Sequence, residues 1–154
     1  MAGTRGRARL ANDAWEALLV AHAVLMKEFA AERIWADVSL REYDVLYTLA
    51  KSAEPIRLGE LNRHVLLSQP ALSRLVDRLV ERGLVQRCPD PADGRGVRLV
   101  LTDEGRARQR EVGLRHGTSV ARAMTDQLDL DELRELERLC RKLADRPSTR
   151  SDHA

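Results

Sequence analysis

The stretch "SQPALSR", residues 68–74, combines side chains that can make specific hydrogen bonds with a strong signal for the start of a helix. Glutamine and arginine can each form paired hydrogen bonds with the polar edge of a flat ring, as on nucleic-acid bases. Ser68 is suited to the N-cap. Pro70 falls in the first turn, where a missing amide costs nothing because the first amides lack an intrahelical acceptor. The pattern predicts a helix over 69–82, ended by Gly83.

The predicted helix 69–82 has one apolar and one polar side at helical periodicity. The apolar side comprises Leu72, Leu75, Val76, Leu79 and Val80. The polar side comprises Pro70, Arg74, Asp77, Arg78 and Glu81, flanked by Gln69 and Ser73. Any surface helix turns polar residues outward, so this helix taken alone also fits an ordinary solvated face. The elements around it decide between the two interpretations.

Positive charge is concentrated in the middle of a chain whose formal net charge is only +2. Residues 57–98 hold eight arginines and five acidic residues, whereas the rest of the chain holds 18 basic and 19 acidic residues. A positively charged central segment suits a polyanionic partner. The composition, 44% hydrophobic and 32% charged in 154 residues, is typical of one globular domain.

The segment before "SQPALSR" shows helical periodicity. Apolar residues at three- and four-residue steps predict a long helix over 10–35. "SLRE" is a capping box that starts a second helix, over 39–52. "RLGELNRHV" predicts a short helix over 57–65. A short helix followed closely by the helix 69–82 is the order of a helix-turn-helix.

The segment after the helix 69–82 changes to strand periodicity and then returns to helix. "LVQR" and "VRLVL" are strand-like runs around the turn-rich "CPDPADGRG", which predicts a hairpin with a long exposed tip. Thr102 and Asp129 cap two further helices, over 102–127 and 129–144. A helix-turn-helix followed by an arginine-bearing hairpin is a winged helix-turn-helix. The predicted fold class is therefore mainly α with a small β-hairpin wing (α+β).

The run "LGELNRHVLLSQPALSRLVDRLVERGLVQRCPDPADGRGVRLVLTDEG" resembles the winged-helix core of the multiple antibiotic resistance regulator (MarR) family of bacterial transcription factors. "SQPALSRLVDRLVERGLVQR" is similar to that family's recognition helix and first wing strand. "DPADGRG" followed by "VRLVLTDEG" is similar to its wing and the start of its next helix. The sequence departs from the pattern at Asn62, where a small apolar residue is usual. The flanking helices match in order and length, so the resemblance covers nearly the whole chain.

The resemblance implies a lobe that binds double-stranded DNA through a recognition helix and a wing. The recognition helix, 69–82, would lie in the major groove, and the wing, 88–96, at the backbone or the minor groove. In the wing, Asp93 would hold Arg95, and Arg95 would contact DNA. The predicted DNA-binding residues are Ser68, Gln69, Pro70, Ser73, Arg74, Arg78, Asp93, Arg95 and Arg98.

The resemblance also implies a single MarR-like domain over 1–154 that functions as a homodimer. Its expected parts are a winged helix-turn-helix lobe over 39–101, flanking dimerisation helices over 10–35 and 104–145, and flexible tails over 1–9 and 146–154. The apolar faces of the flanking helices exceed what a small lobe can cover, which favours a second subunit. We expect a repressor that binds an inverted-repeat operator and is released by a small-molecule effector.

The aromatic residues all lie in the first two predicted helices. The family typically binds small, often aromatic or phenolic, anions between the dimer helices and the DNA-binding lobe. The resemblance is therefore compatible with an effector pocket that includes Trp15, His22 and Tyr43. The same side chains fit ordinary core and interface packing, and this alternative stays open.

The sequence supports other functions less well. It has no Gly-rich phosphate loop, Ser/His/Asp order or paired His or Cys ligands, so we predict no enzyme, no metal site and no cofactor. A winged-helix module that binds protein is one alternative, although outward arginines without aromatic anchors argue against it. A redox-sensing regulator that uses Cys88 or Cys140 is another. Without a membrane-length apolar run or a secretory signal, we expect a cytoplasmic protein.

Overall fold

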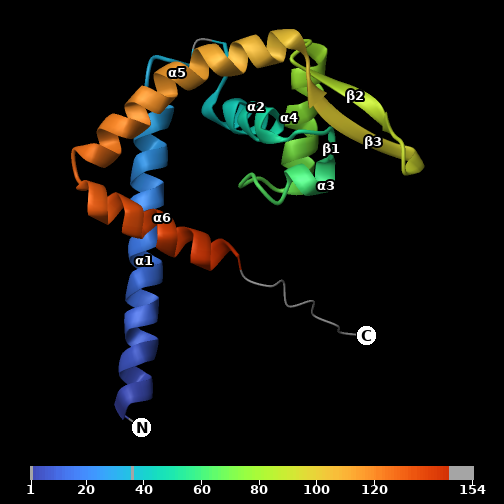
Figure 1. The fold of residues 1–154 in the computed structure, drawn as a ribbon. Helices are drawn as coiled ribbons and strands as arrows, with labels where there is room; N and C mark the ends of the chain where they lie inside the picture. The colour runs from blue at the N-terminus through green and yellow to red at the C-terminus, as the bar shows by residue number, and fades with distance from the viewer. Residues whose placement is uncertain (1, 36, 146–154) are drawn as a thin grey trace, which may run out of the picture. The chain divides into compact units, whose positions relative to one another are not determined.

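The computed structural model describes residues 2–35 and 37–145, except for the side chains of residues 2–5 and 95. The chain divides into two units, Met1–Gly117 and Thr118–Ala154, which are described separately. The elements in chain order are α1 (Ala2–Ala30), α2 (Leu40–Lys51), β1 (Ile56–Arg57), α3 (Leu58–Leu61), α4 (Gln69–Glu81), β2 (Val85–Asp90), β3 (Asp93–Leu101), α5 (Asp103–Thr125) and α6 (Leu130–Ala144) (Figure 1). The predicted class, mainly α with a small β-hairpin wing, is confirmed.

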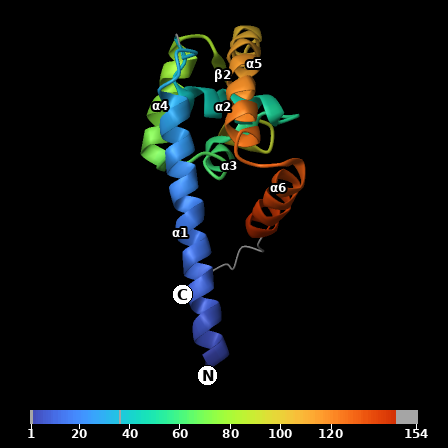
Figure 2. The same cartoon turned by 90° about the vertical axis from the view of Figure 1, so that its left-hand side faces the viewer.

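Helix α1 is one uninterrupted helix (Figure 2) whose bounds differ from the predicted 10–35. It begins at Ala2, so residues 2–9, expected as a flexible tail, are helical. This segment has no proline, and its two alanines and three arginines favour helix, against the two glycines that it also contains. The helix ends at Ala30 because the Trp35 indole donates to the Phe29 carbonyl, giving a terminal carbonyl a partner outside the helix. The tail expected over 146–154 lies outside the described residues.

Helix α2 begins with the predicted capping box, which is confirmed. The Ser39 hydroxyl accepts from the Glu42 amide at 3.3 Å, and the Glu42 carboxylate accepts from the Ser39 amide at 2.8 Å. The inner side of α2 then enters the core of the lobe together with α3, α4 and the sheet. The most completely buried large side chains of this core are Leu46, Leu61, Leu72, Leu79, Val38, Val45, Val76 and Val85.

Helix α3 is much shorter than the predicted helix 57–65. Its N-cap, Arg57, makes no side-chain capping hydrogen bond, and the difference from the prediction lies at its C-terminal end. The chain after Leu61 instead forms turns, and the Asn62 side chain donates to the Leu67 carbonyl at 2.7 Å. Asn62, which departs from the family pattern, therefore braces the turn that leads into α4.

Helix α4 agrees with its prediction to within one residue. Pro70 lies in the first turn, and Gly83 adopts a φ of 70° just beyond the C-cap. Leu72, Leu75, Val76 and Leu79 are buried and Val80 is partly buried, as the apolar side of the wheel predicted. The opposite side is therefore presented outward from the lobe.

The sheet has the strand order β1-β3-β2, with antiparallel pairing throughout. Strands β2 and β3 are longer than predicted and leave only residues 91 and 92 as the hairpin tip. Strand β1, which the sequence analysis missed, pairs Ile56 with Leu99 and Arg57 with Arg98. The wing is therefore an extended hairpin, with a third, two-residue strand along its base.

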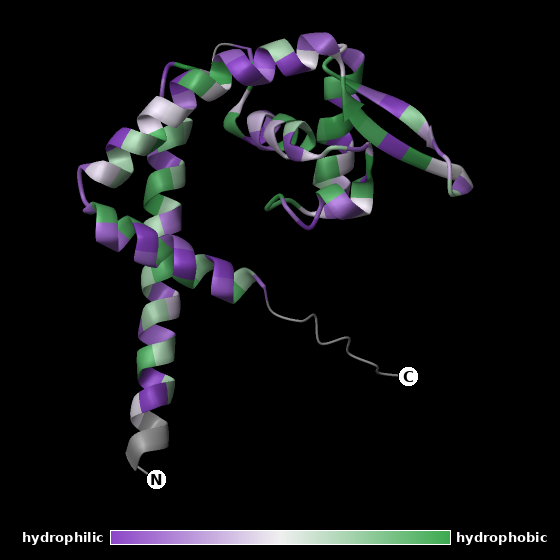
Figure 3. Ribbon diagram, in the orientation of Figure 1, coloured by the Kyte–Doolittle hydropathy of each residue, from purple (hydrophilic) through white to green (hydrophobic). Residues whose placement is uncertain are grey.

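The last two helices also begin at their predicted caps. The Thr102 hydroxyl accepts from the Gly105 amide at 3.0 Å at the start of α5. Asp129 and Glu132 form a capping box at the start of α6. Hydrophobic residues recur along α6 (Figure 3), yet α6 contains no buried residue. Its apolar stripe is thus left without a partner in the described chain.

Candidate nucleic-acid interface

The outward side of α4 carries most of the predicted DNA-contact residues. Exposed here are Ser68, Gln69, Pro70, Arg74 and Arg78, while Ser73 is half-buried. Within the part of the chain that the structure describes, the Arg74 guanidinium has no hydrogen-bond or ion-pair partner. It is therefore available to pair with the polar edge of a base.

The N-terminal end of α4 is open to an anion. Ser68 occupies the N-cap position as predicted, but its hydroxyl makes no capping hydrogen bond. The amides of the first turn are thus not taken up by the cap. Free amides and the positive end of the helix dipole favour a phosphate at this end.

An ion pair fixes the wing beside α4. Arg87 of β2 donates to the Asp77 carboxylate of α4, and the two side chains are 42% and 49% exposed. A pair this exposed contributes little stability. Its effect is positional, because it ties β2 to the outward side of the helix. The sequence placed Asp77 on that side but gave no sign of its partner.

Asp90, the last residue of β2 before the hairpin tip, organises the wing, and its side chain has no exposed surface. Asp90 accepts from the Ala92 amide at 3.0 Å and from Arg57 Nε, and its Oδ1 lies 3.0 Å from Arg98 Nε. The hydrogen bond from the Ala92 amide, opposed by burial and helped by Arg57, holds the pKa of Asp90 below its ordinary value. Asp90 thereby joins β1, β2 and β3.

Arg98, one of the predicted DNA-binding residues, is engaged inside the wing. Its guanidinium contacts Asp90 and donates to the Pro55 carbonyl at 3.3 Å. The side chain is 29% exposed, so its position suits bracing of the wing better than contact at its outer face. Sequence reasoning missed Arg57 and Asp90. The one available signal was an aspartate opening the turn, where its carboxylate can accept from the amide two residues on.

The outer end of the wing carries Asp93 and Arg95. Asp93 Oδ2 lies 4.0 Å from Arg57 Nη2, so a second carboxylate faces the arginine that holds Asp90. The predicted pairing of Asp93 with Arg95 involves a side chain outside the described residues. The backbone of Arg95 lies in β3, at the stretch where its register with β2 shifts beyond Pro89.

Asp90→Asn is expected to destabilise the protein near neutral pH and to have less effect in acid. Because the folded-state pKa of Asp90 is lowered, its carboxylate contributes stability above the unfolded value of about 3.9. That contribution is lost as the pH falls through the folded-state pKa. Urea unfolding of wild type and variant over a pH series measures it. Curves that stay parallel below about pH 4 would contradict a role for the charge.

A cleft of about 760 Å³ lies between α1, α2 and the turn that leads into α4. Its charged and titratable lining residues are His22, Arg41, Asp44, Tyr47, Lys51 and His64, and Val65, Leu66 and Leu67 line it from the turn. Burial raises the pKa of Asp44, and the nearby His22 opposes that shift. Of the predicted effector residues, His22 lies in this cleft.

The structure does not bring Trp15 and Tyr43 into the same cleft. Tyr43 is buried, and its ring centroid lies 5.9 Å from that of Trp35 and 5.3 Å from that of His116. Burial raises the pKa of Tyr43. Trp15 is 60% exposed on α1. For Tyr43 the arrangement is core packing, the alternative that the sequence left open.

The two cysteines, each an alternative redox site, differ in exposure. Cys88 is half-buried, with its thiol 3.6 Å from the Arg98 carbonyl, and Cys140 is exposed. No group of three or more His, Cys, Asp or Glu in the described residues is placed to hold a metal ion. Among those residues, no helix is both long enough and apolar enough to cross a membrane.

A helix-turn-helix with an outward arginine and an attached wing defines a winged-helix DNA-binding regulator. Residues 36–96 match the model of the MarR family. The multiple antibiotic resistance protein MarR of Salmonella typhimurium is 33% identical over 107 residues, which cover 70% of this chain and 74% of that protein. The chain belongs to the MarR family of transcriptional regulators.

Solved structures of bacterial transcriptional regulators resemble this fold. Sco3205, a MarR family transcriptional regulator from Streptomyces coelicolor in complex with DNA, has a TM-score of 0.74 at 29% identity, covering 89% of this chain and 88% of that one. PcaV, a transcriptional regulator from the same organism in complex with its natural ligand, has a TM-score of 0.63 at 28% identity, covering 84% and 88%.

Proposed function

We propose that this protein is a sequence-specific repressor that binds an inverted-repeat operator as a homodimer. The observation that carries the proposal is the outward side of α4, where Arg74 is exposed beside an uncapped helix N-terminus and a wing tied to the same helix. Gln69, Arg74 and Arg78 would contact bases in the major groove, and Arg95 the backbone or minor groove. The similarity to Sco3205, solved with DNA, supports this orientation.

A homodimer would cover apolar surface that each unit leaves exposed. On α1, exposed fractions of 60% at Trp15, 57% at Val20 and 58% at Val24 leave a long apolar stretch in solvent. On α6, Leu130, Leu136, Leu139 and Leu143 are exposed. Burying such surface against a second copy is the ordinary route by which it is stabilised.

Selection of binding sites from random double-stranded DNA, with light scattering of the complex, tests the proposal. We expect enrichment of an inverted repeat whose half-sites lie about one helical turn apart, bound by two protein chains. Enrichment of no sequence, or binding by one chain to a single half-site, would count against it. Repression is then checked by a reporter placed behind the selected operator.

Arg95→Ala is expected to weaken binding to operator and to unrelated DNA by similar factors. An arginine that neutralises a phosphate adds affinity without sequence information and releases a counterion. The slope of log affinity against log salt should fall by about one per binding chain. A salt series by fluorescence anisotropy measures it, and an unchanged slope would remove Arg95 from the phosphate contacts.

An effector would bind in the cleft between α1, α2 and the turn that leads into α4. The cationic lining suits a small anion, and the cleft is partly formed by the turn directly before the recognition helix. The similarity to PcaV, solved with its natural ligand, supports the proposal that this fold binds a small molecule. To release DNA, the effector must prefer the conformation that binds DNA poorly. Operator release by a panel of phenolic acids, abolished by Lys51→Gln, would support this site.

A further inference from the structure

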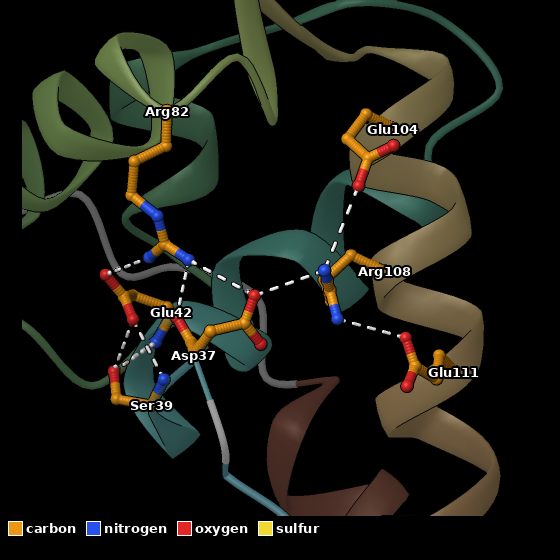
Figure 4. Close-up of polar contacts among 7 residues, drawn as sticks. All are labelled: Asp37, Ser39, Glu42, Arg82, Glu104, Arg108 and Glu111. Carbon is orange, nitrogen blue, oxygen red and sulfur yellow. Dashed lines mark hydrogen bonds and ion pairs between the residues drawn. The ribbon is translucent and has the colours of Figure 1, made fainter.

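Arg82, the C-cap residue of α4, is held by one acidic residue of α2 and one of the connection between α1 and α2 (Figure 4). Its Nη1 donates to Glu42 of α2 at 3.1 Å. Its Nη2 donates to the Asp37 carbonyl at 2.5 Å and lies 4.0 Å from the Asp37 carboxylate. The other Glu42 oxygen accepts from Ser39 in the capping box, so Glu42 is itself fixed. The end of the recognition helix is therefore attached to the start of α2.

Asp37 also contacts α5. Its Oδ2 lies 3.2 Å from Arg108 Nη2, and Arg108 Nη1 donates to Glu111 at 3.0 Å. Figure 4 shows Asp37 between Arg82 and Arg108. The carboxylate offsets the mutual repulsion of the two guanidinium groups. Glu42 also pairs with Arg82, and Glu104 and Glu111 with Arg108, but among the described residues only Asp37 contacts both arginines.

The network acts on geometry more than on stability. The side chains of Arg82, Asp37 and Arg108 are 34%, 46% and 29% exposed, and ion pairs at such positions contribute little to the free energy of unfolding. Their contacts nevertheless join three elements through short, directed bonds. The quantity that they restrict is the position of α4 relative to α5.

We infer that Asp37 is a positioning residue, which bridges Arg82 and Arg108 to hold the recognition helix against α5 and so sets the half-site spacing that the homodimer accepts. The inference rests on the proposed function, in which α5 joins each lobe to the dimerisation helices. In a symmetric dimer both recognition helices move when this contact changes, so the distance between them changes doubly. The affinity of a single lobe for one half-site would hardly change with the same movement.

Asp37→Asn tests the inference because it removes the charge while keeping the size of the side chain and the backbone carbonyl. Wild type and variant are titrated onto the selected operator and onto versions with one or two base pairs inserted between the half-sites. We expect the variant to lose roughly 3- to 30-fold in affinity for the selected operator. It should also discriminate less between spacings than wild type, whereas the melting temperature should change little.

Glu111→Gln is the matched control. It removes another partner of Arg108, but Glu111 lies on α5 and pairs only with α5 arginines in the described chain. We expect wild-type affinity and spacing preference for this variant. Arg108→Gln should reproduce the effect of Asp37→Asn. Combining Asp37→Asn with Arg108→Gln should lower the operator affinity little further than either change alone. A wild-type spacing preference in Asp37→Asn, or an equal loss in Glu111→Gln, would overturn the inference.

A measurement without DNA separates this inference from the proposed function. Amide hydrogen exchange over residues 69–82 should be faster in Asp37→Asn and Arg108→Gln than in Glu111→Gln, because α4 is less firmly held. Equal exchange in all three variants would overturn the positioning role. A wild-type protein that selects no inverted repeat would instead contradict the proposed function, and the exchange rates would still decide the role of Asp37.

Discussion

Arg74→Ala is expected to weaken binding to the selected operator by about 1–3 kcal/mol, while binding to unrelated DNA falls far less. The Arg74 guanidinium is exposed on the outward side of α4 and has no partner within the described residues. It lies in the N-terminal half of the helix, which meets base edges in helix-turn-helix proteins. Fluorescence anisotropy with the operator and a scrambled duplex, at one salt concentration, gives both affinities.

Arg110→Ala provides the control for the loss of one positive charge. Arg110 is exposed on α5, outside the proposed interface. Its removal should lower the affinity for operator and scrambled duplex equally and slightly, through long-range electrostatics alone. Site selection with Arg74→Ala should also show relaxed preference at one position of each half-site. Equal behaviour of the two variants would mean that α4 does not present Arg74 to a base.

The starts of α2, α4, α5 and α6 were predictable because the residues that mark a helix start are close together in sequence. The pairs Ser39 with Glu42 and Asp129 with Glu132 each stand three residues apart, and the structure shows both capping boxes. The recognition helix was bounded in the same way, by Pro70 near its start and Gly83 beyond its end. Its inward and outward sides followed from the helical period.

The contacts that position the candidate site were not predictable from local patterns. Asp90 meets Arg57 across 33 positions of sequence, and Arg82 meets Asp37 across 45. Each charged residue had many possible partners, and only the three-dimensional pairing of the strands and helices selects among them. Strand β1 was not predicted because its two residues are too few to show the alternation of a strand. Arg98 lies in the second wing strand, as predicted, but its contacts with Asp90 and with the Pro55 carbonyl were not predicted.

The expected effector residues show where a family resemblance stops being informative. His22 lines the cleft, but Tyr43 packs into the aromatic cluster with Trp35 and His116. The presence of an aromatic residue in a helix does not by itself indicate whether its side chain packs in the core or lines a pocket. The orientation of α2 in the fold determines which of the two applies, and it directs Tyr43 into the core. The lining of the cleft also includes the turn before α4, and no local pattern associates that turn with a ligand.

Gly105→Ala is expected to destabilise the protein by about 3 kcal/mol or more. A Cβ at position 105 would lie 1.9 Å from the Leu84 carbonyl oxygen. That oxygen already accepts from the Thr102 amide at 3.2 Å, so it cannot move without breaking the junction between α4, β2 and α5. Urea unfolding followed by circular dichroism measures the change in the free energy of unfolding.

Gly117→Ala makes the same substitution in the same helix without the clash, because no atom of the described residues beyond the adjoining turns of α5 itself lies within 4 Å of a Cβ at that position. Alanine favours helix over glycine, so this variant should gain about 0.5–1 kcal/mol. The opposite signs of the two substitutions separate close approach from helix propensity. The loss at position 105 should also reduce operator affinity, because Leu84 lies in the short connection between α4 and β2 of the wing. A Gly105→Ala variant with wild-type stability would mean that α5 is not packed against Leu84 as the structure has it.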